Sequence, residues 1–219
     1  MDLRGEWAAA LRRVCGGQGF DDTHSRLGLI LMARYTESHR RYHTLGHLAA
    51  VLSTIDDLAA CAEAPDVVRL AAWYHDAVYD PQRTDNEERS AELAVNELSQ
   101  AGVAPAAVIR VADLIRHTAG HDSPSGDHDA EVLCDADLRV LASPVPAYDE
   151  YVAAVRAEYA HVPDAGWRAG RSAVLHGLLA LPQLFRTPPA RAWEGAARDN
   201  LTRELAGLGA PSGGATPPG

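Results

Sequence analysis

The sequence predicts an all-α fold, and two observations support this. Apolar residues recur at intervals of three or four along most of the chain, and no stretch alternates long enough to form a β-strand. Prolines fall at the expected starts of helices, where a missing backbone N–H costs no hydrogen bond; these are Pro65, Pro105, Pro163 and Pro188. A chain of 219 residues with 47% hydrophobic content can bury one sizeable core, so we expect one domain.

The helical segments follow from this spacing and from the turn residues between them. We expect helices over residues 3–15, 22–37, 43–63, 66–80, 86–101, 105–119, 129–142, 148–161, 165–181 and 189–207. The Gly- and Pro-rich end, residues 209–219, predicts a disordered tail and leaves residues 1–208 as the folded domain.

The composition excludes several classes of protein. A formal charge of −10 argues against a nucleic-acid surface, which normally carries a basic face. The three cysteines lie far apart, which fits neither a disulfide framework nor a cysteine zinc site. No signal peptide and no apolar run of about 18 residues is evident, so we expect a cytoplasmic, soluble protein without a membrane partner.

The 43–63 helix begins with two histidines in "RYHTLGHLAAVL". His43 and His47 are four residues apart, and their face continues through Val51, Ile55 and Leu58, which are apolar. Such a pair suits joint metal binding, or one ligand beside one proton donor. If the helix begins one residue after His43, the pair becomes two half-exposed histidines at a helix start.

The 66–80 helix carries a third histidine on an apolar face. His75 shares that face with Val68, Ala71 and Val78, and Asp76 follows it directly. A single histidine in this position is most often a hydrogen-bonded core residue. Two further inward histidines on the preceding helix favour a ligand instead.

Two more candidates come from the 86–101 helix and from the segment directly after the 105–119 helix. Glu87 shares a face with Ala91, although a glutamate in the first turn is equally explained by the helix dipole. His121 follows Leu114 and Thr118 on the inner side. Both residues are possible additions to a site.

The 129–142 helix contains two aspartates in "LCDADLRVL" that point to different sides. Asp137 shares a face with Leu133 and Val140, so its carboxylate should point into the core. Asp135 shares a mixed polar and apolar face with Glu131. This face predicts that Asp135 is solvated, pairs with an arginine, or lies behind the metal ligands. We therefore expect Asp137, not Asp135, to be the ligand.

Ionisable side chains from at least three helices thus point to one centre. The set is His43, His47, His75, Asp76 and Asp137, with His121 and Glu87 as additions. Mixed nitrogen and oxygen ligands suit a divalent transition metal, or a pair of ions that includes Mg²⁺ or Mn²⁺. Helical bundles commonly build such sites in their cores.

The order of these residues resembles the H…HD…D signature of the HD superfamily of helical, metal-dependent phosphohydrolases. His47, His75-Asp76 and Asp137 occupy its positions. The segments "RRYHTLGH", "WYHDAVYD", "NEERSA", "RHTAGH" and "CDADLRVL" resemble one bacterial branch of predicted HD-type phosphohydrolases. The resemblance implies an HD-type domain over residues 1–208 that binds one or two divalent ions among Mn, Mg, Fe, Zn, Co and Ni.

"YHTLGH" is also similar to the YHxxxH motif of cyclic-nucleotide phosphodiesterases. In that motif the first histidine donates a proton and the second binds metal, which implies that His43 is the general acid and His47 a ligand. Those enzymes have a further histidine shortly after the HD pair, where this chain has Val78, Tyr79 and Asp80. Cyclic nucleotides as substrates therefore do not follow.

We accordingly expect hydrolysis of a phosphate ester of a small molecule or nucleotide. The expected ligands are His47, His75, Asp76, Asp137 and His121, and the expected catalytic residues are His43 and Glu87. Arg41 is a candidate contact for the phosphate. Two alternatives remain open: a metal- and nucleotide-binding module without turnover, and an HD-type di-iron oxygenase.

Overall fold

The computed structural model describes residues 1–17, 21–121 and 124–209, and this part of the chain is helical without strands. Its α-helices are α1 (Leu3–Val14), α2 (Asp22–Arg34), α3 (Leu45–Leu58), α4 (Pro65–Tyr74), α5 (Asn86–Gln100), α6 (Pro105–Thr118), α7 (His128–Asp137), α8 (Val145–Glu158), α9 (Asp164–Ala180) and α10 (Glu194–Gly209). Three 3-10 helices join them: η1 (Ala59–Cys61), η2 (Leu138–Ala142) and η3 (Ala190–Trp193). The all-α prediction is confirmed.

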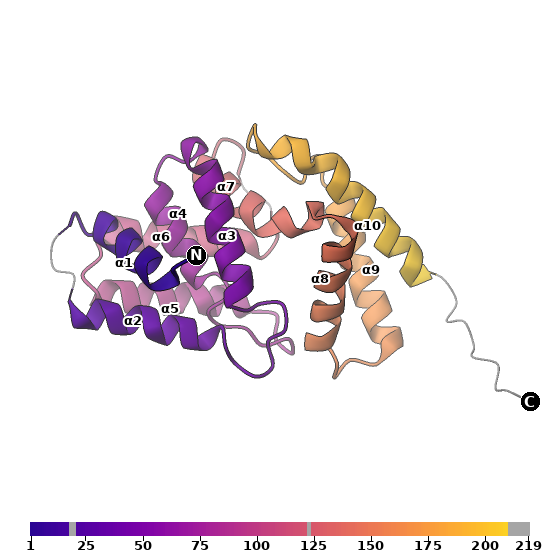
Figure 1. Ribbon diagram of the computed structural model, residues 1–219, viewed down its shortest axis with the longest axis horizontal. Coiled ribbons are helices and arrows are strands. Elements are labelled where there is room, and N and C mark those ends of the chain that lie inside the picture. Colours follow the sequence, from indigo (N-terminus) through magenta and orange to yellow (C-terminus); the bar gives the residue numbers. More distant parts are fainter. Residues whose placement is uncertain (18–20, 122–123, 210–219) are drawn as a thin grey trace, which may run out of the picture.

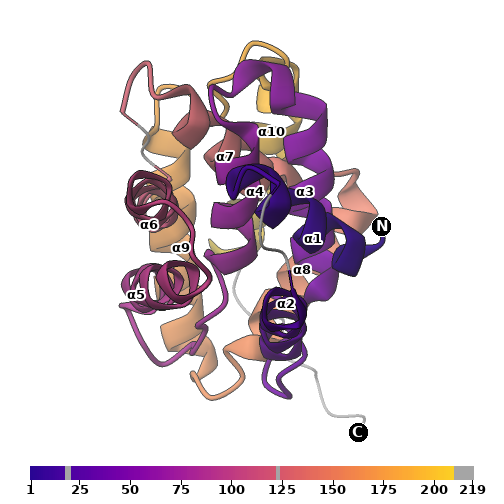
Figure 2. The same cartoon turned by 90° about the vertical axis from the view of Figure 1, so that its left-hand side faces the viewer.

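Helix α4 lies at the centre of the larger group of helices. It packs against α1, α3, α5, α6 and α7, and Figure 2 shows it surrounded by them. Helices α8, α9 and α10 stand beside this group, on the right in Figure 1. The 3-10 helix η2 contacts both α8 and α10, so the chain immediately after α7 connects the two groups.

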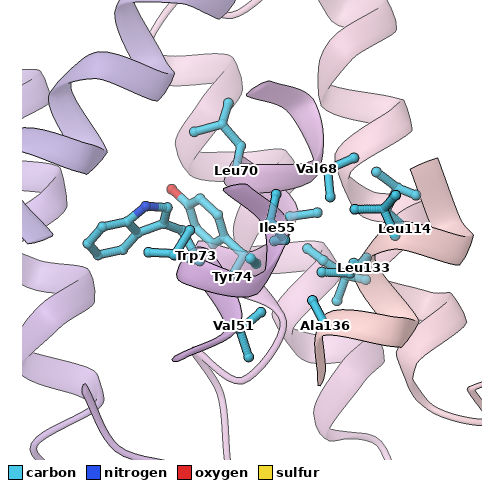
Figure 3. Close-up of a cluster of buried hydrophobic side chains, with 14 of the residues drawn as sticks. Val51, Ile55, Val68, Leu70, Trp73, Tyr74, Leu114, Leu133 and Ala136 are labelled. Carbon is cyan, nitrogen blue, oxygen red and sulfur yellow. The ribbon is translucent and has the colours of Figure 1, made fainter. Parts of the chain in front are cut away.

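The core is built from the apolar faces that the sequence pattern predicts. Ile55, Val68, Leu114 and Leu133 come from α3, α4, α6 and α7 and are fully buried, as Figure 3 shows. Burial of each such side chain stabilises the fold by roughly 1.5–3 kcal/mol relative to exposure. This packing holds the inner ends of α3, α4 and α7 close together.

The helix bounds differ from the sequence prediction at several ends, and two of these differences matter for the site. Helix α3 begins at Leu45 rather than at residue 43, because the side chain of Thr44 caps it by accepting the N–H of Gly46. Helix α4 ends at Tyr74 rather than at residue 80. The carbonyl groups of residues 76 and 77 leave the helical pattern and accept hydrogen bonds from Arg40 instead.

Helix α10 extends to Gly209, two residues past its expected end, so the first residue of the predicted tail is helical. The rest of that tail, residues 210–219, lies outside the described residues. Within the part of the chain that the structure describes, no helix combines the length and the apolar character needed to cross a bilayer.

Candidate metal centre

Four of the predicted ligands converge where α3, α4 and α7 meet. The Nε2 atoms of His47 and His75 are 3.2 Å apart. Asp137 Oδ1 lies 3.2 Å from the His47 nitrogen and 3.6 Å from that of His75. Asp76 Oδ2 lies 3.4 Å and 3.1 Å from the same two nitrogens. Both histidines are buried, and each carboxylate side chain is 16% exposed.

The separations among His47, His75 and Asp137, whose ligand atoms all lie within 4.8 Å of one another, fit ligands that share one cation, and Asp76 lies within 3.4 Å of both histidines. Ligand atoms held about 2.1 Å from an ion in tetrahedral or octahedral geometry lie roughly 3.0–3.4 Å from one another. The tautomer of His75 also suits metal binding, because its Nδ1 lies 2.8 Å from the carbonyl oxygen of Ala72. That carbonyl can only accept, so Nδ1 carries the proton and the neutral ring presents the Nε2 lone pair. We conclude that the residues present suit a divalent metal.

Electrostatics in the metal-free cluster favours protonated histidines. Burial opposes the charged form of His75, but the carboxylates of Asp76 and Asp137 outweigh it and hold the pKa of His75 well above its usual value. The pKa of His47 is raised for the same reasons. Burial likewise opposes ionisation of the two aspartates, yet the surrounding histidines hold the pKa of each well below its usual range. A bound cation would replace the histidine protons as the positive charge that balances the two carboxylates.

His121 reaches the cluster from the turn after α6. Its Nε2 lies 2.9 Å from Asp137 Oδ2, the oxygen that faces away from His47 and His75. His121 has a φ of 48°, a left-handed conformation that histidine adopts more readily than branched residues do. This backbone conformation costs about 1 kcal/mol. The structure therefore brings His121 to the edge of the site.

His43 also lies at the site, but for a reason other than helical spacing. It precedes α3, and its ring centroid is 5.8 Å from that of His47. Its Nδ1 lies 2.7 Å from Glu158 Oε2, so the carboxylate accepts the Nδ1–H and leaves Nε2 for chemistry. The side chain of His43 is 21% exposed, which is compatible with proton exchange. The half-exposed alternative is thus correct about the helix start, yet the two rings remain neighbours.

Glu158, the last residue of α8, was missed by the sequence analysis. Its carboxylate accepts hydrogen bonds from the backbone N–H groups of Arg41, Tyr42 and His43 and from the hydroxyl of Tyr79. Burial opposes its charge, but these hydrogen bonds and His43 lower the pKa of Glu158 to about 2.

A signal for Glu158 was nevertheless present in the sequence. Tyr148, Val155 and Glu158 share one buried face of α8, so Glu158 is a carboxylate on an apolar stripe. The same reasoning identified His75 and Asp137. Applied to α8, it would have placed Glu158 among the inward carboxylates.

Arg40 and Arg41 have different surroundings. Arg40 is buried, and its guanidinium donates to the carbonyl oxygens of His43, Asp76 and Ala77. It therefore holds the segment before α3 against the turn after α4. Arg41 is exposed, donates to two nearby backbone carbonyl groups, and lines a cavity at the site.

Two acidic residues lie away from the four-residue cluster. Asp135 is fully buried, and its carboxylate accepts the backbone N–H groups of Arg186 and Thr187 and the Thr187 hydroxyl. The expectation of a solvated or arginine-paired Asp135 is wrong, because this carboxylate fixes the loop between α9 and η3. Glu87 lies in the first turn of α5 and acts electrostatically on Tyr159, and its catalytic role stays a prediction.

A cavity of about 600 Å³ opens onto the cluster between α3, η2 and α8. His47 and Asp137 line one part of it, together with Arg41 and Tyr42. This volume lies within the range of roughly 300–1,000 Å³ that is usual for small-molecule sites. The centre is therefore accessible to a small ligand.

No family model, curated protein or solved structure matches this chain. The function must therefore be inferred from the residues of the site.

Proposed function

We propose that the chain is an HD-type, metal-dependent phosphohydrolase that cleaves phosphate esters of small molecules or nucleotides. One observation carries the proposal: the Nε2 atoms of His47 and His75 lie 3.2 Å from each other, and each lies 3.1–3.6 Å from a carboxylate oxygen of Asp76 and of Asp137, with the four residues in H…HD…D order. A candidate proton donor, His43, lies beside them with its orientation fixed by Glu158.

A divalent cation bound here would stabilise charge on the phosphoryl oxygens and lower the pKa of bound water toward about 7. His47, His75, Asp76 and Asp137 would hold it, and His121, whose Nε2 lies 2.9 Å from Asp137, would be available for a second ion. Arg41 orients the phosphate from the cavity wall. His43 protonates the leaving oxygen through Nε2, because Nδ1–H is engaged by Glu158.

Metal content and hydrolysis together test the proposal. We expect one or two equivalents of a divalent ion in protein purified without chelator, and metal-dependent release of phosphate from a panel of phosphomonoesters. Asp76→Ala should abolish both. Asp57→Ala, an exposed aspartate of α3, is the matched control and should abolish neither. Full turnover in Asp76→Ala would contradict the ligand assignment.

The two alternatives predict other results in the same experiment. Metal and nucleotide binding without phosphate release from any ester indicates the binding module. Two equivalents of iron with an oxygen-sensitive Mössbauer spectrum, again without phosphate release, indicate the oxygenase.

The proton-donor role of His43 is tested separately. His43→Gln should lower kcat by about 100-fold or more, the usual contribution of a general acid, while metal content stays at the wild-type level. Loss of metal in this variant would mean that His43 is a ligand rather than the acid.

A further inference from the structure

The cavity extends well past the metal cluster. From His47 its lining follows α3 through Ala50 and Ser53 to Thr54, two turns of helix or roughly 10 Å along the axis. The opposite wall is η2 and the start of α8. A phosphate group at the cluster therefore leaves most of the cavity for the rest of the substrate.

Arg139 of η2 also lines this cavity. Its guanidinium carbon lies 4.5 Å from the ring centroid of Trp193, on η3, and the stacking fixes the side chain in place. Among the described residues, no carboxylate lies within ion-pair distance of Arg139 and no acceptor within hydrogen-bond distance of its guanidinium. The half-buried cation thus has its orientation fixed and its N–H donors free.

An arginine without a carboxylate partner among the described residues is unexpected in a chain with a net charge of −10. Arg171, another arginine held against a ring, is paired with both oxygens of Glu204. The carboxylate in the cavity wall outside the cluster, Glu150, is exposed and forms no ion pair with Arg139. A planar guanidinium with free donors is suited to bidentate binding of a carboxylate or phosphate.

We propose that Arg139 binds a second anionic group of the substrate, a carboxylate or a further phosphate, while the scissile phosphate lies at the metal cluster. This inference rests on the proposed function. The substrate is then a phosphate ester with two separated negative groups, and Arg139 determines specificity rather than taking part in bond cleavage.

Binding of matched ligand pairs tests this proposal. We would titrate the Mn²⁺-loaded protein calorimetrically with glycerol 3-phosphate and 3-phosphoglycerate, which differ by a hydroxymethyl group against a carboxylate, and with AMP and adenosine 3′,5′-bisphosphate, which differ by a second, separate phosphate. In at least one pair the ligand with the additional anionic group should bind roughly 10- to 100-fold more tightly. Arg139→Met should remove that preference, and Arg139→Lys should retain part of it. Arg191→Met, an exposed arginine of η3 outside the cavity, should leave it unchanged.

Equal binding within both pairs, or a preference that persists in Arg139→Met, would overturn the proposal. Phosphate release is measured in parallel on all four ligands. Hydrolysis without a preference refutes the role of Arg139 alone. A preference that depends on Arg139, without hydrolysis of any ligand, refutes the phosphohydrolase and leaves the anion subsite in place.

Discussion

Glu158 accepts five hydrogen bonds, which explains why a carboxylate is stable in this buried position. Three come from consecutive backbone N–H groups, and the others come from His43 and Tyr79. The pKa of Glu158 is about 2 in the folded protein, against 4.5 for an ordinary glutamate. This difference corresponds to about 3 kcal/mol in favour of the folded state when the group is ionised.

The sign of the pH dependence follows from the lowered pKa. The contribution of Glu158 is complete above pH 4.5 and is lost as the pH falls toward 2. We expect Glu158→Gln to lower the free energy of unfolding of metal-free protein by up to about 3 kcal/mol at pH 7. The difference should shrink below pH 4.5, as measured by urea denaturation at several pH values. A deficit that does not change with pH would mean that the carboxylate is not ionised in the fold.

At the residue scale, the sequence predicted the convergence of the candidate ligands better than it predicted the residues that hold them in place. His47, His75 and Asp137 lie on apolar faces, and periodicity identifies such faces. Arg40 pairs with the nearby side chain of Glu37, but its partners at the site are backbone carbonyl groups, which no side-chain pattern records. Asp135 was misplaced because its partners belong to a loop more than 50 residues away in the chain.

At the element scale, Arg40 joins the two segments that carry the site. It bridges the residue before α3 and the turn after α4, so a lysine, which lacks the planar fork, cannot satisfy the same carbonyl groups. We expect Arg40→Lys to destabilise the protein by about 2–4 kcal/mol and to weaken metal binding. Arg41→Lys, the neighbouring exposed site, should stay within about 0.5 kcal/mol of wild type. Thermal denaturation and metal titration of both variants measure this, and equal effects would contradict it.

The packing of α1 on α2 depends on a glycine. A Cβ at Gly28 would lie 2.4 Å from Cδ1 of Trp7, which is buried against Trp73. We expect Gly28→Ala to destabilise the fold by about 1–3 kcal/mol, because the indole must move. At Gly170, in the exposed part of α9, a Cβ meets nothing within 4 Å, so Gly170→Ala should stabilise by about 0.5–1 kcal/mol. Chemical denaturation of the pair tests the contrast, and destabilisation by both variants would refute it.

The sequence pattern predicts that each helix exists, but it predicts the residues at which the helices begin and end less well. Ten apolar-periodic segments became ten helices in the described residues. The predicted 66–80 helix is longer than α4 because the apolar pattern of the sequence continues through Ala77 and Val78. The backbone there is held instead by Arg40 and by the hydroxyl of Ser90, which accepts the N–H of Val78.

At the scale of the whole molecule, metal binding and stability should be coupled through pH. Burial opposes the charge on His47 and His75, but their carboxylate neighbours raise both pKa values. The histidines therefore stabilise metal-free protein below the unfolded pKa near 6.5, and this stabilisation is lost as the pH rises through the folded pKa values. Metal binding requires neutral histidines, so it releases protons and strengthens with pH.

We expect the difference in free energy of unfolding between metal-loaded and metal-free protein to grow between pH 6 and 9. The slope should approach about 1.4 kcal/mol per pH unit for each proton released. Paired denaturation curves with and without chelator measure it. His75→Gln should flatten the slope, and His176→Gln, an exposed histidine of α9, should not. An unchanged slope in His75→Gln would show that its proton does not compete with the metal.

The position of Glu158 has a consequence for how such a protein could arise. The ligand candidates come from α3, the end of α4 and α7, whereas the anchor of His43 comes from α8, beyond η2. An ancestral chain ending after α7 would have carried the candidate ligands and His43 without the carboxylate that orients His43. If the proposed function holds, metal binding and the orientation of His43 depend on separate parts of the chain, so a change at Glu158 can alter the second and leave the first intact.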